Sequence, residues 1–143
     1  QLIRQGNVTA AKELLGRPFA LIGTVVKGHG IGGKTLGIHT ANLKVENELL
    51  PAVGIYITQT RIRGTKTWPS ATSVGYNPTF KNKEFSVETH LIGFTGNLLG
   101  KQIEVEFLKW LRAEKNFSSA EELAKAIQND IVETRKYHGL HTR

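Results

Sequence analysis

One glycine-rich stretch of the chain carries residue types suited to binding a polyphosphate. It runs from residue 28 to residue 42 and holds five glycines, one lysine, two threonines and one asparagine. Glycine permits the positive φ angles and the close approach with which backbone N–H groups converge on an anion. Threonine and asparagine oxygens are hard donors of the kind that Mg²⁺ accepts beside phosphate oxygens. The stretch therefore predicts a loop that wraps a phosphate group.

Two literal motif matches within this stretch are excluded by the rest of the sequence. Gly28 to Thr35 fits the P-loop pattern G-x-x-x-x-G-K-[ST], and the glycines also fit G-x-G-x-x-G. Both motifs need a helix directly afterwards, and a P-loop needs an aspartate at the end of a second strand. The residues after Thr35 have low helix propensity, and the only aspartate of the chain is Asp130, in a polar C-terminal segment. We interpret the stretch as a phosphate loop of another architecture.

Glu88 is the candidate general base. It lies among apolar neighbours in residues 85–91, on the face opposite Val87 and Thr89. A carboxylate in that place could take a proton from a substrate hydroxyl. The alternative is that Glu88 is only a solvated strand acid, as we expect for Glu104 and Glu106. Spacing alone favours that alternative.

The elements that must position these residues are mostly short strands. Alternating apolar residues predict strands at residues 19–27, 51–58, 67–76, 85–91 and 103–107. A short helix is predicted from Asn7 to Leu15, and a capping box at Ser119 and Glu122 begins a longer one. Five or six strands followed by a single late helix predict a closed or nearly closed β-barrel with the helix packed outside.

Composition narrows the class of protein. The 143 residues carry 19 Lys and Arg against 12 acids, a formal net charge of +7, which favours an anionic partner. The chain has no cysteine and no apolar run long enough to span a membrane, so we expect a cytoplasmic protein without a membrane partner. It also lacks methionine and opens on Gln1, so we expect a segment of a longer protein.

Several segments, taken in order, resemble the riboflavin kinases, in particular the C-terminal kinase module of bacterial bifunctional riboflavin kinase/FAD synthetases. The resemblance covers almost the whole chain and depends on the order and spacing of its motifs. The segments that carry it are residues 14–19, 23–28, 33–37, 40–43, 54–56, 75–80, 87–90 and 106–117.

The resemblance implies a fold and an activity. The fold is a six-stranded Greek-key β-barrel with a C-terminal α-helix packed outside, in one domain of residues 1–143. We expect a lead-in at 1–16, the barrel at 17–111 and the helix at 118–137. The activity is transfer of the ATP γ-phosphate to the 5′-hydroxyl of riboflavin, giving FMN and ADP, with Mg²⁺ as cofactor. Riboflavin and ATP are then the partners instead of nucleic acid, and an FMN adenylyltransferase module would precede this chain.

Site residues carry over from the resemblance by motif match. Glu88 would be the catalytic base, and Thr40 and Asn42 would hold Mg²⁺. The ATP phosphates would be bound by Gly28, Gly30, Gly32, Gly33, Lys34, Gly37, Thr40 and Asn42. The flavin side would include Asn77, Thr79, Phe80 and Arg112. One position departs from the family pattern, because His39 stands where a proline normally precedes Thr-Ala-Asn. Proline fixes φ and histidine does not, so affinity or rate could be lower, although no proposed ligand is lost.

Two other hypotheses stay open. The net charge is compatible with a basic β-barrel that binds single-stranded nucleic acid, although the aromatic residues are scattered and the glycines cluster. His39 is compatible with a catalytically silent flavin-binding domain.

Overall fold

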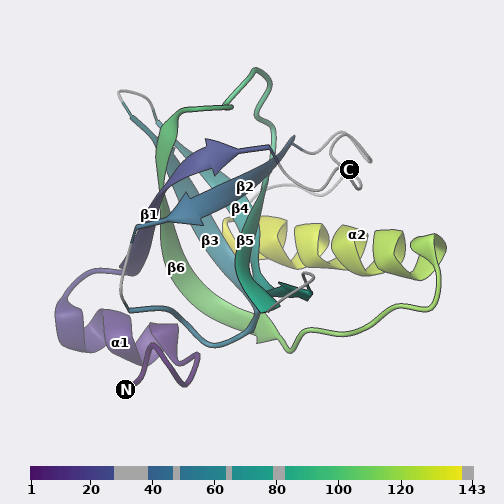
Figure 1. Cartoon of the computed structure of the whole chain (residues 1–143). Helices are drawn as coiled ribbons and strands as arrows, with labels where there is room; N and C mark the ends of the chain where they lie inside the picture. The colour runs from purple at the N-terminus through teal and green to yellow at the C-terminus, as the bar shows by residue number, and fades with distance from the viewer. Residues whose placement is uncertain (28–38, 47–48, 64–65, 79–82, 140–143) are drawn as a thin grey trace.

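The computed structural model describes residues 1–27, 39–46, 49–63, 66–78 and 83–139, with the side chains of residues 77, 78, 83 and 84 left aside. These residues form six strands and two helices (Figure 1). The strands are β1 (Phe19–Val26), β2 (His39–Val45), β3 (Gly54–Ile62), β4 (Thr67–Pro78), β5 (Lys83–Leu91) and β6 (Gln102–Arg112). The helices are α1 (Val8–Leu15) and α2 (Ala120–Tyr137).

The six strands close into an antiparallel barrel in the order β1-β2-β5-β4-β3-β6. The consecutive strands β3, β4 and β5 are neighbours, and β6 lies beside β3, which is the Greek-key arrangement. The prediction of a six-stranded Greek-key barrel is confirmed. One element was missed, because the predicted loop was drawn through Asn42 whereas residues from His39 onward form β2.

Alternation along the strands fills the interior with apolar side chains. Val87 and Leu91 of β5 and Ile103, Val105 and Phe107 of β6 are at most 1 % exposed. Tyr56 is fully buried beside Phe107, and its hydroxyl donates to the carbonyl oxygen of Ala52 at 2.6 Å. Loss of solvent raises the pKa of Tyr56 to about 12. The inward faces of the predicted strands are therefore the core.

Five buried hydroxyl groups share the interior with these apolar residues. Thr58 Oγ1 is 2.7 Å from Ser70 Oγ and 2.8 Å from Thr72 Oγ1. The series extends from Ser70 to Thr60 at 2.8 Å and from Thr72 to Thr89 at 3.1 Å. A buried hydroxyl is costly only when it has no partner, so this series lets β3, β4 and β5 bury polar side chains.

Both helices lie outside the barrel and have identifiable ends (Figure 1). The Asn7 side chain accepts from the backbone N–H of Ala10, and Gly16 closes α1 at a φ of 77°. Ser119 caps α2 by accepting from the N–H of Glu122. In a capping box the Glu122 carboxylate would accept a hydrogen bond from the backbone N–H of Ser119. It accepts from the N–H and the hydroxyl of Ser118 instead, so this half of the predicted capping box is shifted by one residue.

The helix α2 packs against the outer side of β4. Ile131 contacts Ala71 of β4 and Ile92, with Ile127 at the margin of this small cluster. At the end of the helix, His138 Nε2 lies 3.0 Å from the carbonyl oxygen of Thr58. Neither helix of the described part of the chain is long and apolar enough to cross a membrane.

Candidate active site

Four polar side chains meet on the outer face of β2 and β5. The antiparallel register sets Thr40 opposite His90 and Asn42 opposite Glu88. Residues directly opposite each other share a face of the sheet, with Cβ atoms about 4.5–5.5 Å apart. The intervening Thr89 is fully buried inside the barrel, so these four residues point outward. The register thus brings together residues separated by almost 50 positions in sequence.

Glu88 is the predicted general base. It lies mid-strand, with Asn42 opposite it on β2 and Ser73 opposite it on β4. Its side chain is 36 % exposed, so a ligand can reach it. Partial burial disfavours the charged carboxylate and raises the pKa of Glu88. A carboxylate with a raised pKa accepts a proton more readily than an ordinary glutamate does.

His90 contacts both Thr40 and Glu88. Its Nδ1 lies 3.0 Å from Thr40 Oγ1, and its Nε2 lies 3.8 Å from Glu88 Oε1. Burial lowers the pKa of His90, and the negative charge of Asp130 acts in the opposite direction. Sequence reasoning missed this residue as a functional candidate. The available signal was its alternation with Glu88 on one strand face, which means little until the partner strand is known.

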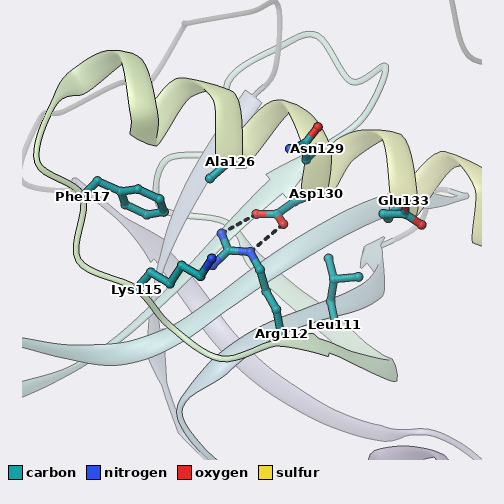
Figure 2. A pocket seen from close by; sticks show the side chains of 8 residues that line it. All are labelled: Leu111, Arg112, Lys115, Phe117, Ala126, Asn129, Asp130 and Glu133. Atoms are coloured by element: carbon teal, nitrogen blue, oxygen red, sulfur yellow. Dashed lines mark hydrogen bonds and ion pairs between the residues drawn. The ribbon is translucent and has the colours of Figure 1, made fainter.

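A hollow lies between the end of β6, the connection that follows it and α2 (Figure 2). Its volume is about 220 Å³. We call it the α2 hollow, and it is lined by Leu111, Arg112, Lys115, Phe117, Ala126, Asn129, Asp130 and Glu133. Its walls combine an aromatic ring and aliphatic side chains with charged groups, a composition suited to an amphipathic ligand.

Arg112 and Asp130 form a two-pronged ion pair in this hollow. Arg112 Nε donates to Asp130 Oδ1 and Nη2 donates to Oδ2, both at 2.8 Å, as the dashed lines of Figure 2 show. The hydrogen bond to Asp130 raises the pKa of Arg112. A third donor, Nη1, reaches the carbonyl oxygen of Ala113 at 3.1 Å. Most donors of Arg112 are therefore engaged in fastening α2 to the end of β6.

The comparisons with known proteins match this chain over most of its length. The family model described as "Flavokinase: Riboflavin kinase" matches residues 15–138. The chain belongs to the riboflavin kinase family. It is 34 % identical over 140 residues to the bifunctional riboflavin kinase/FMN adenylyltransferase of Escherichia coli K12, and 32 % identical over 139 residues to that of Bacillus subtilis. These matches cover 98 % and 94 % of this chain.

The chain spans less than half the length of these riboflavin kinase relatives, 44 % and 43 % respectively. Among solved structures, one from Streptococcus pneumoniae, titled a macrolide-efflux protein, matches with a TM-score of 0.85 and 33 % identity. The match covers 94 % of this chain and 44 % of that one. A riboflavin kinase from Trypanosoma brucei has the same fold, with a TM-score of 0.56 and 23 % identity over 84 % of this chain and 79 % of that one.

The riboflavin kinase motif residues divide into two groups in this structure. Thr40, Asn42 and Glu88 meet on one face, and Arg112 lines the α2 hollow. Asn77 lies in β4 opposite Glu84. The remaining predicted residues fall outside the described part of the chain, and they are Gly28, Gly30, Gly32, Gly33, Lys34, Gly37, Thr79 and Phe80.

His39, which replaces the proline typical of riboflavin kinases, is held by aromatic packing. It begins β2 opposite Leu91, and its ring meets that of Phe94 edge-on, with centroids 5.1 Å apart. Phe94 in turn meets Trp68 edge-on at 5.3 Å. Packing of the His39 ring therefore anchors the start of β2, next to Thr40, where proline would restrict φ.

The donor chemistry beside Glu88 suits magnesium better than a transition metal. Thr40 and Asn42 offer neutral oxygen donors two residues apart on the same strand face. The described residues contain no group of three or more His, Cys, Asp or Glu that could hold a metal ion by themselves. Mg²⁺ typically takes few protein ligands and completes its shell with water and substrate phosphates, so this sparse oxygen set fits it.

Proposed function

We propose that this chain is a riboflavin kinase that transfers the γ-phosphate of ATP to the 5′-hydroxyl of riboflavin, giving FMN and ADP. The observation that carries the proposal is the register of Asn42 opposite Glu88, in a chain that belongs to the riboflavin kinase family. A phosphate-binding face and a proton acceptor then lie side by side, as direct transfer to a hydroxyl requires.

Glu88 acts in this proposal as the general base. Its carboxylate takes the proton of the 5′-hydroxyl while the hydroxyl oxygen forms a bond to the γ-phosphorus. The bond between that phosphorus and the bridging oxygen breaks, and its electron pair leaves with ADP. Positioning and electrostatic stabilisation supply most of the rate enhancement of such a transfer, and general-base catalysis adds about 10²–10⁴-fold.

Thr40 and Asn42 serve the phosphate side. Their side-chain oxygens would hold Mg²⁺, which when bound neutralises charge on the β- and γ-phosphates. The glycine-rich segment, with Gly28, Gly30, Gly32, Gly33, Lys34 and Gly37, would wrap the ATP phosphates. Backbone N–H groups and one lysine are suited to that task.

The α2 hollow is the proposed flavin side. Phe117 provides an aromatic wall, and the Arg112–Asp130 pair joins β6 to α2 beside it. The volume of about 220 Å³ is below the roughly 300–1,000 Å³ typical of small-molecule pockets. We therefore assign part of the isoalloxazine ring to this hollow. Asn77, Thr79 and Phe80 would approach the flavin from the β4–β5 side.

The upstream partner is proposed from the relatives. They are bifunctional and more than twice as long as this chain, so an FMN adenylyltransferase module would precede it in a cytoplasmic protein. This chain alone would then form FMN without converting it to FAD.

Incubation of the purified chain with riboflavin, ATP and Mg²⁺ tests the activity. Chromatography should show FMN and ADP accumulating in equal amounts, and omission of ATP should abolish both. A folded chain that binds riboflavin without consuming ATP would instead be a silent flavin-binding domain. Tight binding of an oligonucleotide with a steep salt dependence, and no FMN formation, would support the nucleic-acid hypothesis.

A further inference from the structure

His90 contacts a residue of each proposed function, Thr40 on the phosphate side and Glu88 as the base. Its two ring nitrogens approach different partners, Thr40 Oγ1 at 3.0 Å and Glu88 Oε1 at 3.8 Å. Its side chain is 15 % exposed, so solvent competes little with these partners. The charged group of α2 that acts electrostatically on His90 is Asp130, itself paired with Arg112, and the residue opposite His90 on β4 is Ala71.

The chemistry of the two partners selects one arrangement of protons. Thr40 Oγ1 keeps both of its lone pairs free for a cation only if its own O–H donates to His90 Nδ1. Nδ1 is then an acceptor, and the ring proton resides on Nε2, facing the Glu88 carboxylate. The opposite tautomer would turn a bare Nε2 lone pair toward that carboxylate, which is electrostatically unfavourable.

We propose that His90 is a positioning residue that orients the Thr40 hydroxyl and the Glu88 carboxylate through its two ring nitrogens. The inference rests on the proposed kinase function. Nε2–H attracts Oε1 of Glu88 and leaves Oε2 to accept the substrate proton. The 3.8 Å separation is longer than a hydrogen bond, and such contacts often shorten when substrate binds.

Three substitutions separate positioning from packing. His90→Phe retains a ring but removes both nitrogens, and we expect kcat to fall about 10- to 100-fold, the usual cost of losing an orienting partner. His90→Asn sets a polar atom near the place of Nδ1, so KM for ATP should stay close to the wild-type value while kcat falls. His90→Gln sets one near Nε2, so it should recover more of kcat and raise KM for ATP.

A packing role predicts the reverse order, with His90→Phe the most active variant of the three. That outcome, in a variant whose thermal unfolding matches wild type, would overturn the proposal. His138→Phe is the matched control, because it also keeps a ring and removes the ring nitrogens, one of which lies 3.0 Å from the carbonyl oxygen of Thr58, outside the proposed site. It should lower stability without the split between kcat and KM.

A second measurement does not depend on turnover. In protein labelled with ¹⁵N-histidine, the ring nitrogen shifts of His90 should report a proton on Nε2 and none on Nδ1, with the signal assigned by its loss in His90→Phe. A proton on Nδ1 would overturn the proposal. If the wild-type chain forms no FMN, the kinase function fails by itself, while the tautomer measurement still decides the orientation of Thr40 and Glu88.

Discussion

Replacement of Glu88 by glutamine removes the charge of the proposed base and keeps the shape of the side chain. Loss of a general base lowers kcat by about 10²–10⁴-fold. Each factor of ten corresponds to about 1.36 kcal/mol, so the activation free energy should rise by about 2.7–5.4 kcal/mol. ATP binding should change little, because Thr40 and Asn42 remain. The assay is FMN formation at saturating ATP and riboflavin, with KM for each substrate measured in parallel.

The same substitution should lower activity but raise the stability of the folded chain at neutral pH. Burial raises the pKa of Glu88 in the folded chain, so the folded state favours the protonated carboxyl. That contribution is fully present below the pKa of the unfolded chain and is lost as pH rises through the folded value. Glu88→Gln should therefore unfold at a higher temperature than wild type at neutral pH, with the difference disappearing in acid.

Glu104→Gln is the matched control for both measurements. Glu104 also lies on the outer face of a strand, and its side chain is 38 % exposed against 36 % for Glu88. It makes a surface ion pair with Arg61 at 3.5 Å, a contact that contributes about 0–1 kcal/mol. Turnover in Glu88→Gln equal to that of Glu104→Gln would refute the base assignment. A less stable Glu88→Gln at neutral pH would refute the electrostatic reasoning.

Three further outcomes follow from the contacts. The acid limb of the kcat–pH profile should lie above the ordinary carboxyl range, because burial raises the pKa of Glu88; a limb within that range would contradict its assignment as the base. Asp130→Asn breaks the two-pronged pair and leaves the Arg112 charge partly buried, so urea unfolding should show a loss of about 3 kcal/mol; a loss well under 1 kcal/mol would show that solvent already compensates for the pair. His39→Ala removes the edge contact with Phe94, so its free energy of unfolding should fall by about 0.5–1.5 kcal/mol beyond the loss from burial. His39→Phe should recover most of that loss in thermal unfolding. Equal losses in both variants would exclude the aromatic contact as the anchor.

Periodicity predicted which residues share a strand face in residues 85–91 and 103–107, and it did so correctly for β5 and β6. Val87, Thr89 and Leu91 are buried in the barrel as expected, and Glu88 faces outward. Periodicity does not predict which strand lies beside which. The strands β2 and β5 are neighbours in the barrel without being consecutive in sequence, so periodicity could not place Asn42 opposite Glu88, and the resemblance to a family assigned both residues to one site without predicting their register.

The missed strand β2 has a physical explanation. His39, Thr40, Ala41 and Asn42 follow a run of glycines and show no clear apolar alternation, because the core-facing residues of β2 are Ala41 and, beyond these four, Leu43 and Val45. Ala41 is too small to mark a strand face in a hydropathy pattern. Pairing with β1 and β5 on both sides forms this strand, in spite of its weak local signal.

The burial and pairing of Asp130 depend on tertiary contacts that its neighbours in the sequence do not indicate. Its place in a polar C-terminal segment excluded it as the acid of a P-loop, and nothing in its neighbours indicated burial. In the folded chain it is 7 % exposed, pairs with Arg112 and acts electrostatically on His90. One carboxylate thus joins α2 to β6, lines the α2 hollow and acts electrostatically on His90. A ligand in that hollow would therefore lie beside the carboxylate whose charge acts on His90.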